Sequence, residues 1–270
     1  MLSCALKLTT IPGDKDQMTE TGRPRAGIAQ RIRLLKRHPV WRPQHDIFVK
    51  TVSALVLPSA AAALSVSCGD GSWDWLAFAS NPDLKSIVAT DVVDCPVTGD
   101  DVTRLNRHGA WSYQKVTPDR VWPFDDNCFD LVFHMDVLEH TSKPGLFLSE
   151  NYRVLKSGGY LLCGTPNIFR PANVLKLLLG KLAFPCGLGP GIFNPRYLNP
   201  GIPSDTMTHV QEFNQYQLRI MLEEAGFEMV STDCCFFGVS FLKLKFKDFP
   251  VGNLGRNLCQ YLFCVAQKRR

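Results

Sequence analysis

The sequence predicts an α/β fold built around a parallel β-sheet. Apolar strand-like runs alternate with helical segments along most of the chain, which is typical of βαβ units. The chain has 270 residues, of which 45% are hydrophobic and 20% are charged. This is the composition of a globular protein large enough for one domain with insertions.

Turn and cap residues separate the predicted elements. The first helix ends before Pro58, a later one ends at Gly158 and Gly159, and another is capped by Asn214 with Gln217 three residues on. We expect helices at 46–57, 72–80, 98–109, 142–158, 172–182 and 214–225, and strands at 61–68, 86–91, 111–116, 128–135, 160–166, 228–237 and 259–267.

The positive charge is concentrated in an N-terminal arm. Residues 1–50 hold ten Lys or Arg against four Asp or Glu, whereas the other 220 hold 20 against 21. We therefore divide the chain into a basic arm at 1–45, a main domain at 46–267 with a lid-like insertion at 167–208, and a basic tail at 268–270. The arm has two interpretations. It could make peripheral contact with an anionic membrane surface, or it could simply be a basic helix exposed to solvent. Nucleic-acid binding is not expected, because no aromatic or sequence motif supports the charge.

The ten cysteines form no C-x-x-C pair, and several lie in apolar runs. This pattern predicts buried thiols in a reducing compartment, and so a cytoplasmic protein without structural disulfides. The apolar stretch 51–69 is interrupted by Pro58 and is rich in Ser and Ala. We interpret it as part of the fold and not as a membrane span.

A Gly-Asp-Gly turn at 69–71 follows the first strand, and Asp91 ends the second about twenty residues later. Such a turn admits a ligand close to the backbone, and the acid can bind two ribose hydroxyls. The site therefore predicts a nucleoside. Asp74 stands where a dinucleotide fingerprint has its third glycine, and an anion there disfavours pyrophosphate, so adenosylmethionine is favoured over a nicotinamide cofactor.

The segments "LSVSCGDGSWDWLA", "IVATD", "WPFDDNCFDLVFHMDVLEHTSKP", "RVLKSGGYLLCGTPN" and "HVQEFNQYQLRIMLEEAGF" occur in this order. Together they resemble the class I S-adenosylmethionine-dependent methyltransferases with a type 11 domain, over residues 46–267. The resemblance implies a Rossmann-like, seven-stranded, mostly parallel sheet with an antiparallel last strand and helices on both faces. It also implies S-adenosyl-L-methionine as cofactor and methyl transfer as the activity.

The same resemblance assigns the cofactor site by position. The turn would lie against the methionine and ribose moieties, Asp91 would bind the ribose, and Asp119 would bind the adenine amino group, with its register uncertain by one residue. The last two residues of the fourth strand would line the methionine moiety. The full predicted set is Ser67, Gly69, Asp70, Gly71, Asp91, Val92, Asp119, His134 and Met135.

Two positions depart from the family pattern. Ser65 stands where the family usually has an acid, and Ser67 stands where it usually has glycine. These departures keep a catalytically weak binding protein of the same fold as an alternative. A nicotinamide-dependent oxidoreductase is the other alternative.

Two histidines are candidate general bases for a hydroxyl or amine acceptor, namely His140 and His209. Asp136, Glu139 and His140 have the spacing of one helical turn and could bind a divalent ion. We nevertheless expect no metal, because three ligands so close in sequence need further ligands from other parts of the chain to complete a metal site. The acceptor is predicted to lie under the insertion and to be a small molecule, a glycan or a lipid-linked compound, most simply methylated on oxygen.

Overall fold

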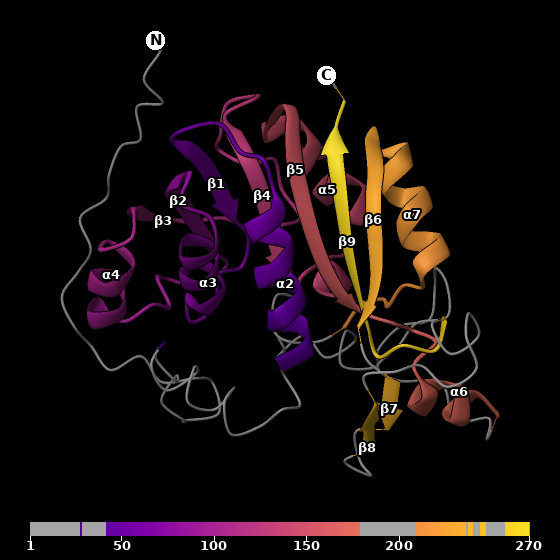
Figure 1. Cartoon of the computed structure of the whole chain (residues 1–270). Coiled ribbons are helices and arrows are strands. Elements are labelled where there is room, and N and C mark those ends of the chain that lie inside the picture. The colour runs from indigo at the N-terminus through magenta and orange to yellow at the C-terminus, as the bar shows by residue number, and fades with distance from the viewer. Residues whose placement is uncertain are drawn as a thin grey trace.

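The computed structural model describes residue 28 and residues 42–178, 209–235, 237–239, 244–246 and 257–269. These residues contain a seven-stranded sheet between two layers of helices (Figure 1). Its strands are β1 (Ala61–Ser65), β2 (Leu84–Asp91), β3 (Ala110–Lys115), β4 (Phe129–Met135), β5 (Leu155–Pro166), β6 (Phe227–Cys235) and β9 (Tyr261–Lys268). The helices are α2 (Arg42–Ala54), α3 (Ser72–Ser80), α4 (Gly99–Leu105), the 3₁₀ helix η1 (Leu138–His140), α5 (Pro144–Val154), α6 (Pro171–Leu178) and α7 (Gln215–Glu224).

The strand order is β3-β2-β1-β4-β5-β9-β6. The pairs β1–β2, β1–β4, β2–β3 and β4–β5 are parallel. Strand β9 enters between β5 and β6 and is antiparallel to both. This confirms the expected sheet, in which only the last strand of the chain runs against the others.

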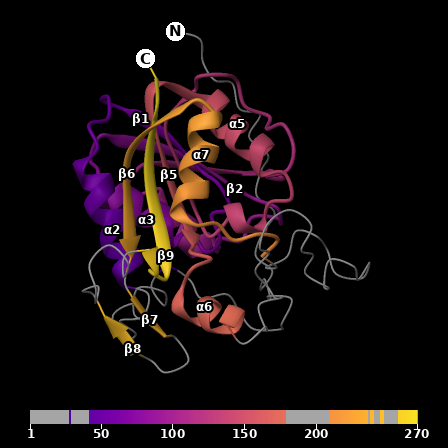
Figure 2. The same cartoon turned by 90° about the vertical axis from the view of Figure 1, so that its right-hand side faces the viewer.

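The two faces of the sheet have separate hydrophobic cores. Phe48 of α2 and Phe78 of α3 pack on one face with Phe133 of β4, whereas Phe147 of α5 and Leu218 of α7 pack on the other. Figure 2 shows α7 and α5 on one side of the strands and α2 and α3 on the other. Burial on both faces explains why five of the seven residues of β4 are apolar.

Several boundaries differ from the sequence prediction. Helix α2 begins at Arg42 and not at residue 46, because Pro43 is compatible with the first helical turn. Helix α5 ends at Val154, and Gly158 and Gly159, predicted to end it, lie inside β5. The β4–β5 register shifts between Phe129 and Leu131, so these glycines accommodate a strand irregularity. A small second sheet, β7 (Phe237–Val239) with β8 (Leu244–Phe246), was not predicted.

The arm and the insertion are described only at their edges. Of the predicted arm, the structure describes Ile28 and residues 42–45, and of the insertion it describes residues 167–178; the remainder of both lies outside the described residues. Ile28 is buried, and its N–H donates a hydrogen bond to Asp101 of α4 at 2.9 Å. Helix α6, the described part of the insertion, lies beyond the end of β5 (Figure 1).

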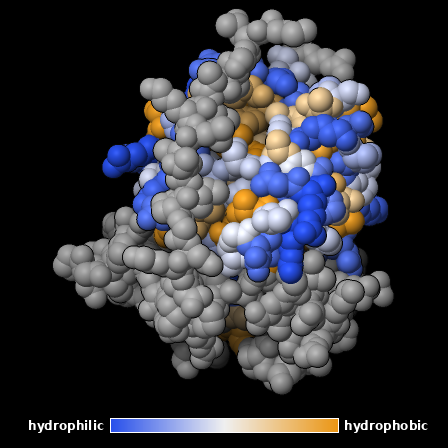
Figure 3. Space-filling view, turned by 90° about the vertical axis from the view of Figure 1, so that its left-hand side faces the viewer, coloured by the Kyte–Doolittle hydropathy of each residue, from blue (hydrophilic) through white to orange (hydrophobic). Residues whose placement is uncertain are grey.

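The surface and the cysteines can be described for part of the chain. Hydrophilic and hydrophobic residues are interspersed on the coloured part of the side shown in Figure 3. On edge strand β3, Lys115 pairs with Asp94 at 3.1 Å. No disulfide joins any two of the eight described cysteines, and five of the eight are buried. Within the described ranges, every helix is too short or too polar to cross a bilayer.

Candidate cofactor and acceptor site

The turn after β1 lies at the carboxyl end of the central strands. The N–H of Val66 donates to Phe133 of β4 at 3.0 Å, and the N–H of Cys68 donates to Thr90 of β2 at 2.8 Å. Ser67, Gly69 and Gly71 all have positive φ, at 56°, 57° and 75°. The chain therefore turns back tightly at the sheet edge and then enters α3.

The predicted ribose acid, Asp91, is joined to this turn. One of its carboxylate oxygens accepts from the N–H of Gly69 at 3.1 Å, and the other accepts from the N–H of Val92 at 2.8 Å. Apart from its two neighbours in the chain, no described residue has an atom within 4 Å of the position that a Cβ at Gly69 would take. Each carboxylate oxygen keeps a further lone pair. The open space beside Gly69 and this fixed acid suit a nucleoside with adjacent hydroxyls.

The other predicted turn acid, Asp70, is engaged within the protein. Its Oδ1 accepts from the backbone N–H of Ser72 at 3.0 Å and also from the Ser72 hydroxyl. It thus satisfies an N–H at the start of α3, as a capping side chain does. Asp70 shapes the turn, and its contact with the cofactor stays a prediction.

Asp74 does not face the ligand side of the turn, so the geometry behind our argument against pyrophosphate is wrong. Its carboxyl is fully buried and accepts hydrogen bonds from Ser65 Oγ at 2.5 Å and Trp111 Nε1 at 2.7 Å. Burial raises the pKa of Asp74 to about 7, although both hydrogen bonds act to lower it. Ser65, where the family resemblance led us to expect an acid, therefore contacts the carboxyl of Asp74 in the first turn of α3.

Three further predicted residues have structural partners of their own. Asp119 accepts hydrogen bonds from the N–H groups of Ser142 and Lys143, just before α5, at 3.1 to 3.2 Å. His134 is almost fully buried and its ring lies edge-on to Phe147, with centroids 4.8 Å apart. Met135 is also buried, with its sulfur 3.9 Å from the hydroxyl of Tyr261. Their roles toward the cofactor stay predictions.

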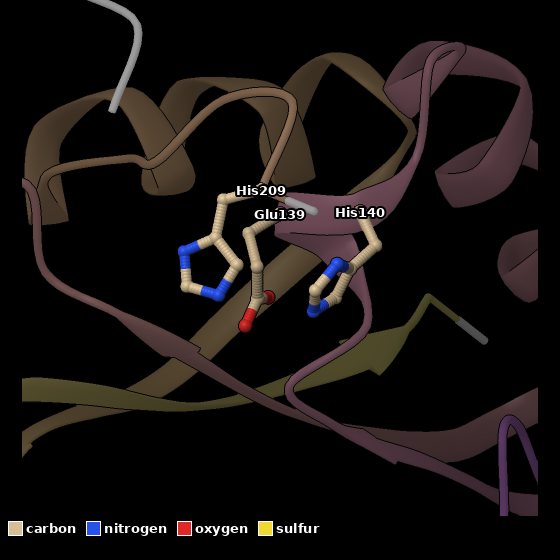
Figure 4. Close-up of side chains that lie close together, drawn as sticks. All are labelled: Glu139, His140 and His209. Carbon is tan, nitrogen blue, oxygen red and sulfur yellow. The ribbon is translucent and has the colours of Figure 1, made fainter. Parts of the chain in front are cut away.

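The two candidate bases lie side by side. The rings of His140 and His209 have centroids 4.8 Å apart and are nearly perpendicular. One ligand-type atom from each of Glu139, His140 and His209 lies within 4.8 Å of the others. Figure 4 shows the Glu139 carboxylate between the two imidazoles. We call these three residues the EHH cluster.

The expected helical turn over Asp136, Glu139 and His140 is wrong. Only residues 138–140 are helical, as the 3₁₀ helix η1, and Asp136 precedes them with a φ of 58° in an exposed position. Asp136 is therefore outside the EHH cluster, and His209 takes the third place. The backbone explains this approach, because Val210 and Gln211 donate N–H groups to the carbonyl of Glu139 at 2.6 and 3.2 Å.

Buried polar residues fix the EHH cluster, and sequence reasoning missed them. Glu212 is fully buried, binds Arg170 at 2.7 Å and lies 2.7 Å from Nδ1 of His209. Thr165 donates its hydroxyl to Oε2 of Glu139 at 2.9 Å, whereas Oε1 has no hydrogen-bond partner among the described residues. Burial and the charge of Asp136 raise the pKa of Glu139 well above its usual range. His209 and Glu212 lie in a non-helical segment before α7, so no helical spacing in the sequence signalled their contact.

The fold and the site together define the class. A doubly wound sheet with a glycine turn after β1, an acid ending β2 and a last strand reversed against its neighbours is the Rossmann-like architecture that binds a nucleoside at its carboxyl edge.

Comparisons with known proteins agree. A family profile described as "Methyltransferase domain" matches residues 64–163. A probable S-adenosylmethionine-dependent methyltransferase of Mycolicibacterium smegmatis is 26% identical over 234 residues, which cover 86% of this chain and 76% of that protein. A demethylmenaquinone methyltransferase of Lactiplantibacillus plantarum is 28% identical over 229 residues, covering 76% of this chain and 84% of that protein.

A solved structure shares the fold. The crystal structure of a putative methyltransferase from Bacillus halodurans C-125 has a TM-score of 0.53 and 22% identity, and the match covers 82% of this chain and 97% of that one. The matched domain and the two relatives support a class I S-adenosylmethionine-dependent methyltransferase. Its cofactor is S-adenosyl-L-methionine, which supplies a methyl group activated on a sulfonium sulfur.

Proposed function

We propose that this methyltransferase methylates a hydroxyl oxygen of its acceptor. The observation that carries the proposal is the EHH cluster, which follows β4 at the same edge of the sheet as the glycine turn. In the reaction the sulfur–methyl bond breaks, an oxygen–methyl bond forms, and the sulfur keeps the electron pair. The neutral leaving group needs no acid, so alignment supplies much of the acceleration.

The hydroxyl must also lose its proton, and the EHH cluster is suited to this step. His209 is held through Nδ1 by Glu212 at 2.7 Å, so that its Nε2 can receive a proton and release it to solvent. A cation bound by the cluster would instead increase the acidity of the hydroxyl. Either route favours an oxygen acceptor over one that carries no acidic proton.

The acceptor is proposed to have an apolar part. Phe169, Leu175 and Leu178, in and just before α6, are 40%, 48% and 77% exposed. Exposed apolar side chains beyond the carboxyl end of the sheet suit an aromatic or lipid-linked molecule better than a free sugar.

The test uses methyl-labelled S-adenosylmethionine and pairs of acceptors that share a skeleton but carry either a hydroxyl or a methoxy group. We expect label on the hydroxyl member only, recovered by mass spectrometry as a methyl ether. His209→Ala should lower turnover at neutral pH, with partial recovery at alkaline pH, where the acceptor ionises without help. Label on carbon or nitrogen would overturn the proposal.

A further inference from the structure

The EHH cluster has the composition of a metal site. Two imidazoles and one carboxylate form a ligand set that proteins use for Zn²⁺ with an open coordination position. The three residues come from two segments about 70 positions apart in the sequence. We propose that Glu139, His140 and His209 bind a divalent transition-metal cation of the Zn²⁺ type.

The carboxylate provides the independent support. Glu139 is fully buried, its Oε1 lacks a hydrogen-bond partner in the described structure, and it points between the two imidazoles (Figure 4). A buried carboxylate oxygen left unpaired is costly. A cation between the rings would satisfy this oxygen and balance its charge.

The surrounding hydrogen bonds are those of a metal centre. A metal-binding histidine usually donates its other ring N–H to a carboxylate. His209 has this arrangement, with Nδ1 2.7 Å from Glu212, which leaves Nε2 for the metal. Likewise the Thr165 hydroxyl holds Oε2 of Glu139 at 2.9 Å and so leaves Oε1 directed at the cluster.

The distances need only a small contraction. Two ligands about 2.1 Å from one ion are at most about 4.2 Å apart, and the cluster atoms lie within 4.8 Å of one another. Rotation of the half-buried rings of His140 and His209 closes this difference. Imidazole ligands favour Zn²⁺ over Mg²⁺, which prefers oxygen.

The metal site would add to the proposed function by activating the acceptor hydroxyl. This catalytic role rests on the proposed function, whereas the binding of the cation does not. An acceptor hydroxyl bound at the open position would become more acidic and lose its proton to solvent. The binding of the cation is a property of the chain itself and can be measured without any acceptor.

The experiment is calorimetric titration of the full, chelator-treated chain with Zn²⁺, and titration with Co²⁺ followed by visible absorption. We expect one ion per chain and a cobalt spectrum without a thiolate charge-transfer band. Glu139→Gln, His140→Asn and His209→Asn should each weaken binding at least about tenfold, as should Thr165→Val. His108→Asn, at an exposed histidine near the opposite edge of the sheet, is the matched control and should bind normally.

Each variant must still bind adenosylhomocysteine, which shows that it is folded. If the substitution of the buried Glu139 prevents folding, the variants of the half-buried His140 and His209 still test the metal site. Unchanged Zn²⁺ affinity in the histidine variants, or a thiolate band from the many cysteines, would overturn the metal site. Zn²⁺ binding without hydroxyl methylation would refute the proposed function alone. Chelator-resistant hydroxyl methylation without Zn²⁺ binding would refute the metal site alone.

Discussion

At the scale of single residues, a few backbone and carboxylate contacts hold the turn after β1, which is the predicted cofactor turn at residues 66–71. Asp91 connects the turn after β1 to the end of β2 through the N–H of Gly69. Ser65 donates its hydroxyl to the buried carboxyl of Asp74 at 2.5 Å. This contact fixes the end of β1 against α3, whereas the effect of Ser65 on cofactor affinity stays a prediction.

We predict that Asp91→Ala weakens adenosylhomocysteine binding by about 1 to 3 kcal/mol, because ribose hydroxyls would lose a charged acceptor. Asp91→Asn, which keeps the shape and one acceptor oxygen, should lose less. Calorimetric titration measures both variants. Unchanged affinity in Asp91→Ala would mean that the nucleoside lies elsewhere.

Ser67 adopts a φ of 56° that favours glycine, and a residue with a side chain in this region costs roughly 1 to 2 kcal/mol. Ser67→Gly should therefore raise the free energy of unfolding by about 1 kcal/mol or less, after the larger entropy loss of glycine on folding. Ala60→Gly, at a φ of 60°, is the control and should give a similar gain in urea unfolding. A loss confined to Ser67→Gly would reveal a stabilising contact of the serine hydroxyl.

At the scale of elements, β4 and α5 enclose a polar ring in an apolar interface. His134 lies in β4 and packs on Phe147 of α5, and neither of its ring nitrogens has a hydrogen-bond partner in the part of the chain that the structure describes. Desolvation by burial lowers the pKa of His134 to about 3. Protonation of this histidine therefore competes with the packing of α5 on the sheet.

Acid should destabilise the protein through His134. Between pH 6.5 and about 3 the unfolded chain binds a proton at this residue that the folded chain does not, so stability falls with falling pH, by up to about 1.4 kcal/mol per unit. His134→Phe should remove this part of the loss between pH 7 and pH 5 in urea unfolding. His108→Phe, at an exposed site, should keep it. Equal losses in the wild type and His134→Phe would contradict the assignment.

At the scale of the whole molecule, the sheet order brings the cofactor turn, β4 and the segment that carries His209 to one edge. Strand β9 fills the gap between β5 and β6 and so completes the fold with the last described residues. Asn167 contributes to this closure, because its side chain donates to the carbonyls of Asn257 and Cys259 at 2.9 Å.

Cofactor binding should stabilise this assembly as one unit. Adenosylhomocysteine at one hundred times its Kd should stabilise the folded chain by about 2.7 kcal/mol, which appears as a higher Tm in calorimetry. NADH at the same concentration should give no shift. A shift with NADH alone would support the oxidoreductase alternative, and no shift with either would indicate a weak binding protein.

The sequence by itself determined the class of fold, the identity of the cofactor and the order of nearly all the elements. The fold class and the element order follow from local patterns, namely strand and helix periodicity, the 69–71 turn and the Asn214 cap, which need no knowledge of distant contacts. The cofactor follows from the resemblance to a known family, because the 69–71 turn and Asp91 by themselves predict only a nucleoside. Only the tertiary structure decided that Asp74 faces Ser65 and Trp111, that His134 is buried, and that His209 and not Asp136 joins Glu139 and His140. The physical reason is that side-chain direction and contact between distant segments depend on chain packing, such as the hydrogen bonds from Val210 and Gln211 to Glu139, and no local pattern encodes them.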